Sequence, residues 1–163
     1  MVGYRTIVCL GLLCGVVSTA PLATAATAQH VLPKRLWSVS LKKHRGLGRG
    51  LYQYGYPVLH DGILYTGSAT GGIHAIDTNG KKQWSFVTRG PVFAPVRIDT
   101  GTLYATDAEG VLYALDVATG ASRWHTEIGA EVMARPLVVN DTLYLVPMRG
   151  HLVAVDAKTG TPR

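Results

Sequence analysis

Hydrophobic residues between positions 91 and 130 fall into four short runs separated by turn residues. The runs are 94–98, 102–107, 110–116 and 122–128. Runs of this length, bounded by Gly, Asp and small polar residues, predict β-strands. In the third run, Leu112 and Ala114 lie on one face, and the residues that alternate with them on the other face are also apolar. We therefore expect a sheet that is covered on both sides.

The same pattern recurs along the chain with a period of about 40 residues. The dipeptide Leu-Tyr, for example, occurs at 64–65, 103–104 and 143–144. No stretch longer than about ten residues shows the periodicity of an amphipathic helix. The sequence therefore predicts an all-β chain in which four-stranded antiparallel sheets are repeated.

Small antiparallel sheets that recur at this period and cover one another describe the blades of a β-propeller. A β-sandwich is the alternative, since it also has short strands and regularly spaced turns. A sandwich does not require a repeat of this length, so the propeller is favoured. We expect blades at 57–90, 91–130 and 131–163. These are about three blades of an incomplete ring, because closed propellers have about four to eight.

The N-terminal residues 1–28 have the pattern of a secretory signal peptide. A weakly basic start at 1–5 precedes an apolar run at 7–17, and small residues offer cleavage after Ala25 or Ala28. A retained membrane anchor is the alternative, but the apolar run is shorter than the ~20 residues that a spanning helix needs. We therefore expect a periplasmic or secreted bacterial protein.

The cysteine positions limit the chemistry of the mature chain. Both cysteines, Cys9 and Cys14, lie inside the predicted signal peptide, and neither follows the small residue that a bacterial lipobox requires. This disfavours a lipid anchor. Cleavage would also leave no cysteine, which excludes disulfides, thiolate metal sites and cysteine nucleophiles. The 47% hydrophobic and 16% charged composition is that of a packed globular protein.

Basic residues are concentrated between the signal peptide and the first blade, in a chain of net charge +6. We expect residues 29–56 to hold an isolated outer strand and a crossing rich in glycine and arginine, "RGLGRG". This crossing lacks the Lys-Ser/Thr of a phosphate-binding loop. A solvated loop is favoured, and contact with anionic lipid or an acidic partner is the alternative. The candidate contact residues are Lys42, Lys43, Arg45 and Arg49.

Three stretches share one motif: "AIDTNGKKQW" at 75–84, "ALDVATGASRW" at 114–124 and "AVDAKTGTPR" at 154–163. They resemble the pyrroloquinoline-quinone-like, or tryptophan-docking, β-propeller repeats, and the resemblance covers about residues 36–163. It implies that each Trp docks against a neighbouring blade. The small side chain of alanine lets adjacent sheets approach closely. Asp can accept hydrogen bonds from the backbone amides of the turn, and Gly suits a left-handed turn position. We expect structural roles for Trp37, Ala75, Asp77, Gly80, Trp84, Ala114, Asp116, Gly120, Trp124, Ala154, Asp156 and Gly160.

The segment around Trp37, "PKRLWS", resembles the tryptophan strands "KKQWS" and "ASRWH". Residues 36–41 are therefore expected to form the outer, fourth strand of a blade whose other strands do not precede it. The third repeat ends before its tryptophan strand. Two interpretations stay open: a longer reading frame with about seven or eight blades, which is favoured, or assembly of copies in which the Trp37 strand of one completes the third blade of another.

Quinoprotein dehydrogenases also use this repeat, and their cofactor sites typically combine a floor tryptophan, calcium ligands and a vicinal disulfide. The sequence has no Cys-Cys pair, and Glu109, Glu127 and Glu131 lie in no matching ligand motif. His74 and His151 do not occupy equivalent repeat positions. We therefore expect no cofactor, metal or catalytic residues in these blades. Pyrroloquinoline quinone and calcium are the alternative, if further blades hold the site.

The chain is also similar to the β-propeller subunit family of the outer-membrane β-barrel assembly machinery. The similar segments are the leading "LWSVSL", the glycine-rich crossing and residues 129–160. That family is non-catalytic and offers loops and sheet edges to partner proteins. The resemblance implies an extracytoplasmic scaffold that binds a protein partner, with no nucleic acid and only peripheral membrane contact. The alternative is an N-terminal fragment of a quinone-dependent dehydrogenase.

Overall fold

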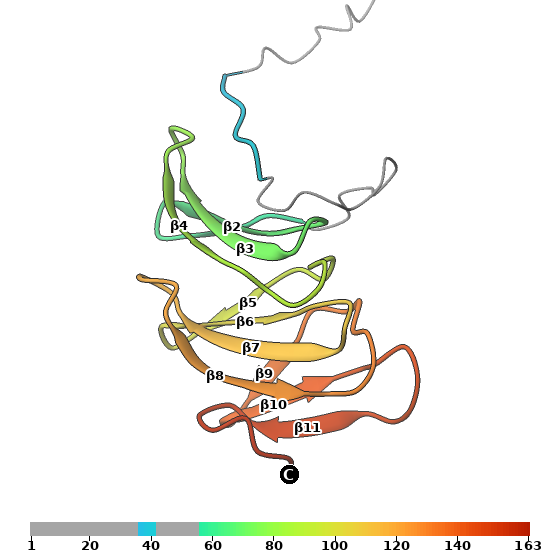
Figure 1. Cartoon of the computed structure of the whole chain (residues 1–163). Helices are drawn as coiled ribbons and strands as arrows, with labels where there is room; N and C mark the ends of the chain where they lie inside the picture. The colour runs from blue at the N-terminus through green and yellow to red at the C-terminus, as the bar shows by residue number, and fades with distance from the viewer. Residues whose placement is uncertain (1–35, 42–55) are drawn as a thin grey trace, which may run out of the picture. The chain divides into compact units, whose positions relative to one another are not determined.

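The computed structural model describes residues 36–41 and 56–163. These residues contain eleven β-strands and no helix (Figure 1). Consecutive strands pair antiparallel to form two four-stranded sheets and one three-stranded sheet. The prediction of an all-β chain of repeated antiparallel sheets is therefore confirmed.

The three sheets follow one another along the chain. Sheet 1 contains β1 (Val58–His60), β2 (Ile63–Ser68), β3 (Gly72–Asp77) and β4 (Lys82–Phe86). Sheet 2 contains β5 (Arg97–Asp99), β6 (Thr102–Thr106), β7 (Val111–Asp116) and β8 (Ser122–Glu127). Sheet 3 contains β9 (Leu137–Val139), β10 (Thr142–Leu145) and β11 (Val153–Asp156). Strand β5 begins later than its apolar run, because Pro95 has no amide hydrogen to donate to a sheet.

A register shift in each four-stranded sheet positions the motif tryptophans. In sheet 2 the pairing of β7 with β8 shifts between Ala114 and Leu115, and in sheet 1 the pairing of β3 with β4 shifts at the equivalent place. Trp84 consequently pairs with Ala75, and Trp124 pairs with Ala114. Both alanines are fully buried. Their small side chains leave room for the large indole ring on the neighbouring strand.

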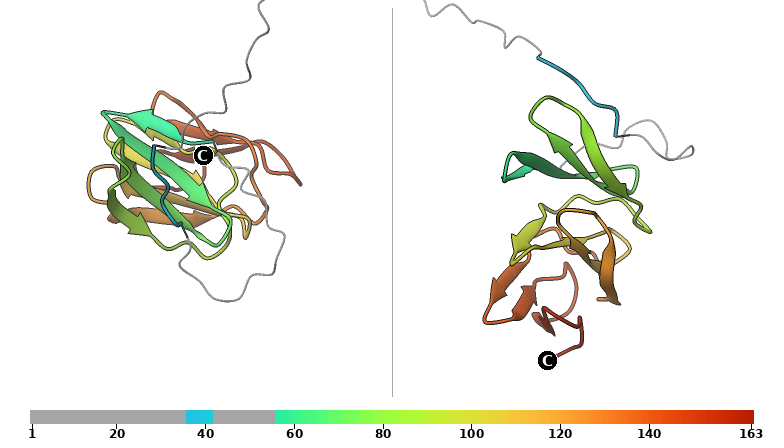
Figure 2. Two further views of the ribbon diagram at one scale, coloured as in Figure 1. Left: turned by 90° about the horizontal axis from the view of Figure 1, so that it is seen from above. Right: turned by 90° about the vertical axis from the view of Figure 1, so that its left-hand side faces the viewer.

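Sheet 2 is covered on both faces by its neighbours (Figure 2). One hydrophobic cluster joins Ile73 of sheet 1 to Leu103 and Leu115 of sheet 2. The other joins Leu112 of sheet 2 to Leu143 of sheet 3. Both apolar faces of β7, which the sequence predicted, are therefore buried against a neighbouring sheet. We call the contact between sheets 1 and 2 the first seam and that between sheets 2 and 3 the second seam.

Residues 36–41 form no strand, in contrast to the expectation from the tryptophan pattern. A β-strand requires a hydrogen-bonded neighbour, and no strand of the described residues pairs with this segment. Its hydrogen bonds to sheet 1 involve side chains instead, such as that from Ser68 Oγ to the Leu41 carbonyl at 3.4 Å. In sheet 3, a single bridge between Val155 and Pro162 takes the place of the fourth-strand pairing.

Candidate functional site

Trp84 closes the first seam by docking on a turn of sheet 2. Its indole Nε1 donates a hydrogen bond to the Val117 carbonyl at 3.1 Å. The ring lies against Gly120, where a Cβ atom would be 2.6 Å from two atoms of the indole. Gly120 has φ +72, a conformation that residues with a Cβ rarely adopt. Both the turn and the close approach of the ring therefore require glycine.

The other motif tryptophans make similar contacts. Trp37 Nε1 donates to the Thr78 carbonyl at 2.9 Å, and the ring lies against Gly80. Trp124 lies against Gly160 in the second seam, where a Cβ would be 2.5 Å from the indole. Residues 36–41 thus dock on sheet 1 as β4 docks on sheet 2, although they form no strand.

Two buried tyrosines reinforce the seams, although their place in the sequence indicated only the period of the repeat. Tyr65 donates its hydroxyl proton to the Val117 carbonyl at 3.2 Å, beside the bond from Trp84. Tyr104 donates to the equivalent Ala157 carbonyl at 3.0 Å. Burial raises the pKa of both phenols. The recurring Leu-Tyr dipeptide was the signal that could have identified them.

The motif aspartates hold the turns on which the tryptophans dock. Asp116 accepts hydrogen bonds from the Ala118 and Thr119 amides at 3.1 and 3.0 Å, and Arg123 binds its other oxygen at 2.8 Å. The Arg123 hydrogen bond is the main cause that lowers the pKa of Asp116 to about 2. Asp156 is held in the same way by its turn amides and by Arg163, and its pKa is also lowered to about 2.

Sheet 1 has a similar turn in which the side-chain partner of the aspartate is uncharged. Asp77 accepts hydrogen bonds from the Asn79 and Lys81 amides at 2.9 Å each. Gln83 takes the place of the arginine, and its Nε2 donates to Asp77 Oδ2 at 3.1 Å.

A buried carboxylate ties the opposite end of the first seam. Asp107 accepts hydrogen bonds from the Gly90 amide at 3.0 Å, the Val111 amide at 2.9 Å and the Tyr113 hydroxyl at 2.8 Å. Burial and the Asp107 hydrogen bond raise the pKa of Tyr113 to about 12. Asp107 was missed in the sequence, because the third repeat has Pro147 at the equivalent position.

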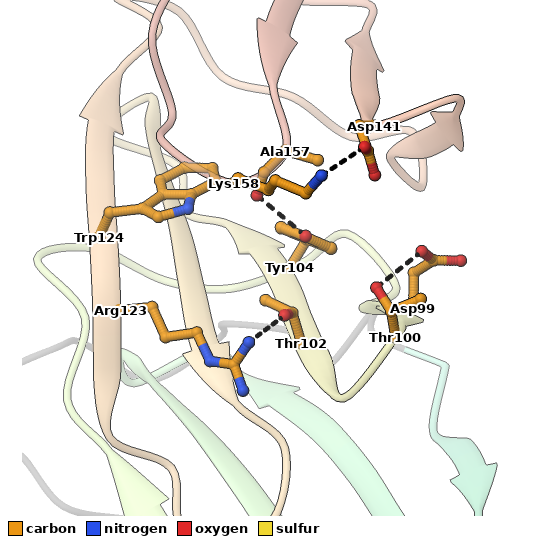
Figure 3. A pocket seen from close by; sticks show the side chains of 9 residues that line it. All are labelled: Asp99, Thr100, Thr102, Tyr104, Arg123, Trp124, Asp141, Ala157 and Lys158. Atoms are coloured by element: carbon orange, nitrogen blue, oxygen red, sulfur yellow. Dashed lines mark hydrogen bonds and ion pairs between the residues drawn. The ribbon is translucent and has the colours of Figure 1, made fainter.

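A recess of about 280 Å³ opens beside Trp124 in the second seam (Figure 3). Charged groups line it, but they are paired: Lys158 binds Asp141 at 2.6 Å, and Arg123 binds Thr102 at 2.7 Å in addition to Asp116. The first pair lies within the third repeat and the contacts of Arg123 lie within sheet 2, whereas the hydrogen bond from Tyr104 to the Ala157 carbonyl joins the two repeats.

The remaining candidate residues are not brought together. His74 is buried and shares a hydrogen bond with Ser85 at 2.9 Å, whereas His151 is exposed. Within residues 36–41 and 56–163, no cluster of His, Cys, Asp or Glu could hold a metal ion. In the same residues, no helix is long and apolar enough to cross a membrane. The basic candidates Lys42, Lys43, Arg45 and Arg49 lie outside the described residues.

Comparison with known proteins gives the relatives of this chain. The outer membrane protein assembly factor BamB of Escherichia coli (strain K12) is 27% identical over 134 residues, which are 76% of this chain and 33% of that protein. A quinohemoprotein alcohol dehydrogenase of Comamonas testosteroni is 33% identical over 101 residues, which are 55% of this chain and 13% of that enzyme. The crystal structure of BamB from Moraxella catarrhalis matches with a TM-score of 0.59 at 25% identity. The match covers 67% of this chain and 35% of that chain.

These matches confirm the predicted fold class, since the sheets are β-propeller blades, about three of an incomplete ring. The chain spans about a third of the length of the BamB relatives. The family model described as outer membrane protein assembly factor BamB matches residues 33–163. The chain therefore belongs to the BamB family of pyrroloquinoline-quinone-like repeat proteins.

Proposed function

We propose that this protein is a non-catalytic, extracytoplasmic scaffold that binds protein partners in the assembly of outer-membrane proteins. The observation that carries the proposal is the BamB family match over residues 33–163. It is supported by the way the motif side chains are used, since the tryptophans and aspartates are engaged in contacts between and within sheets. Such a molecule offers its loops and sheet edges for binding.

Deletion of the gene tests this proposal. We expect the deletion strain to contain less folded β-barrel protein in its outer membrane, measured as heat-modifiable bands on gels, and the wild-type gene to restore the level. A variant destabilised at a seam, Gly120→Ala, should restore it less well. Unchanged amounts of folded β-barrels in the deletion strain would contradict the proposal.

A quinone-dependent dehydrogenase is the second candidate, because the Comamonas enzyme is 33% identical over 101 residues. In that case pyrroloquinoline quinone and calcium would bind to parts of the protein beyond the described residues. Addition of both to the purified protein should then change the quinone absorbance and give alcohol-dependent dye reduction. The scaffold proposal expects neither effect.

The extracytoplasmic location can be tested separately. We expect the protein in the periplasmic or membrane fraction, with an N-terminus that begins after Ala25 or Ala28. Cell fractionation followed by N-terminal sequencing makes this measurement. Recovery in the cytoplasmic fraction with Met1 or Val2 at the N-terminus would contradict it.

A further inference from the structure

The two seams differ at the end opposite the motif tryptophans. A backbone hydrogen bond from Ala108 to Pro91 at 2.7 Å recurs as one from Met148 to Glu131 at 2.8 Å. This equivalence fixes the alignment of the second and third repeats in this region. It places Pro147 at the position of Asp107, the carboxylate that ties the first seam.

Because Pro147 has no carboxylate, the second seam lacks the hydrogen-bond acceptor that Asp107 provides in the first seam. In the first seam, Asp107 accepts the Gly90 amide. The equivalent amide in the second seam is that of Ala130, which donates no hydrogen bond to any of the described residues. The paired strands of the hairpin that carries Pro147 are also shorter, since β10 and β11 have 4 residues each, whereas β6 has 5 and β7 has 6.

A cavity of about 370 Å³ lies at this place. Its lining residues are Gly129, Ala130, Glu131, Met148 and Arg149. Arg149 replaces Glu109 of the second repeat, so the charge at this turn is reversed. Arg149 is exposed and forms no ion pair with a described residue, including Glu131, which lines the same cavity. The cavity is thus lined by a backbone amide and a guanidinium group that no described residue binds.

We propose that this cavity binds a carboxylate from an acidic segment of a partner protein. The carboxylate accepts hydrogen bonds from the Ala130 amide and from Arg149, and so replaces in trans the acceptor that Asp107 supplies in cis. Guanidinium groups bind carboxylates through strong, charge-assisted hydrogen bonds. Met148 offers apolar contact to the carbon chain that bears the carboxylate. Glu131 opposes binding, because its negative charge faces the same cavity.

Titration of the ¹⁵N-labelled full chain with two blocked tripeptides tests the proposal by NMR. One probe is acetyl-Ser-Glu-Ser-amide, which carries only a side-chain carboxylate, and the other is acetyl-Ser-Ser-Ser with a free C-terminus. We expect saturable shifts of the Ala130 amide and the Arg149 Nε signals with the glutamate probe. Binding of the free C-terminus alone would contradict an acidic segment as the source of the carboxylate. No saturable shift with either probe up to about 10 mM would overturn the proposal.

Variants separate this site from general charge attraction. Arg149→Gln should weaken binding at least about tenfold, and Glu131→Gln should strengthen it, because each changes the charge that the carboxylate meets. Arg135→Gln is the matched control, since Arg135 is also an exposed arginine, lies on the loop between β8 and β9 that carries Glu131, and does not line the cavity. Equal affinity of Arg149→Gln and the control would contradict the proposal.

A second variant restores the acceptor within the chain. Pro147→Asp should place a carboxylate near the Ala130 amide, slow the hydrogen exchange of that amide and abolish the peptide-induced shift. Pro147→Ala, which removes the ring without adding a carboxylate, should retain peptide binding. Peptide binding that is equally strong in Pro147→Asp would overturn the assignment.

Discussion

At the scale of single residues, the seams depend on glycines that meet a tryptophan. In Gly120→Ala the new Cβ would strain a positive φ and press on the Trp84 ring. We expect a loss of about 2–4 kcal/mol in the free energy of unfolding, measured by urea denaturation. Gly101→Ala is the control, because Gly101 has the same φ of +72 but no atom within 4 Å of the added Cβ. Equal losses for both variants would show that the indole contact contributes nothing.

The motif carboxylates make the stability of the folded protein depend on pH. The folded-state pKa of Asp116 is lowered to about 2 by Arg123, so the unfolded chain binds its proton more readily than the folded chain does. The resulting stabilisation is present above about pH 4 and is lost as the pH falls towards 2. Urea midpoints measured between pH 5 and pH 2 should therefore fall less steeply in Asp116→Asn than in the wild type. A parallel decrease in both proteins would contradict this assignment.

At the scale of elements, Asp107 joins the loop after β4 to the hairpin between β6 and β7. Asp107→Asn keeps the volume but supplies an amide nitrogen where an acceptor is needed. We expect a loss of about 1–3 kcal/mol in the free energy of unfolding, because buried donors lose their partner. The pKa of Tyr113 should also fall below its value of about 12, measured by absorbance titration, since Asp107 contributes to raising it. Asp99→Asn, at a partly exposed side chain, should change stability by less than about 0.5 kcal/mol.

At the scale of the whole molecule, the sheets differ in how completely they are covered. Leu112 in β7 of sheet 2 has no exposed surface, whereas 64% of the equivalent Leu152, which directly precedes β11 of sheet 3, is exposed. Regions with fewer buried contacts open at lower free energy. Hydrogen exchange measured by mass spectrometry should therefore show slow exchange in β6 and β7 and faster exchange in β10 and β11. Equal protection of the two hairpins would mean that another part of the protein covers sheet 3.

The sequence alone determined the features that depend on local spacing. Alternation in β7 showed that both faces of a sheet are buried, and the 40-residue period showed that the sheets repeat. The Asp and Gly of each motif belong to one turn, so their hydrogen bonds could be anticipated from residues a few positions apart.

Only the tertiary structure decided which turn each tryptophan reaches and how the seams differ. Trp37 was expected in a strand because its neighbours resemble strands, but pairing requires a second strand beside it. Asp107 and Gly90 are separated in the chain and meet because two sheets stack. The same stacking brings Ala130 and Pro147 to the equivalent positions in the second seam. A linear pattern records what is buried, whereas the partner across a seam depends on how whole sheets are positioned against each other.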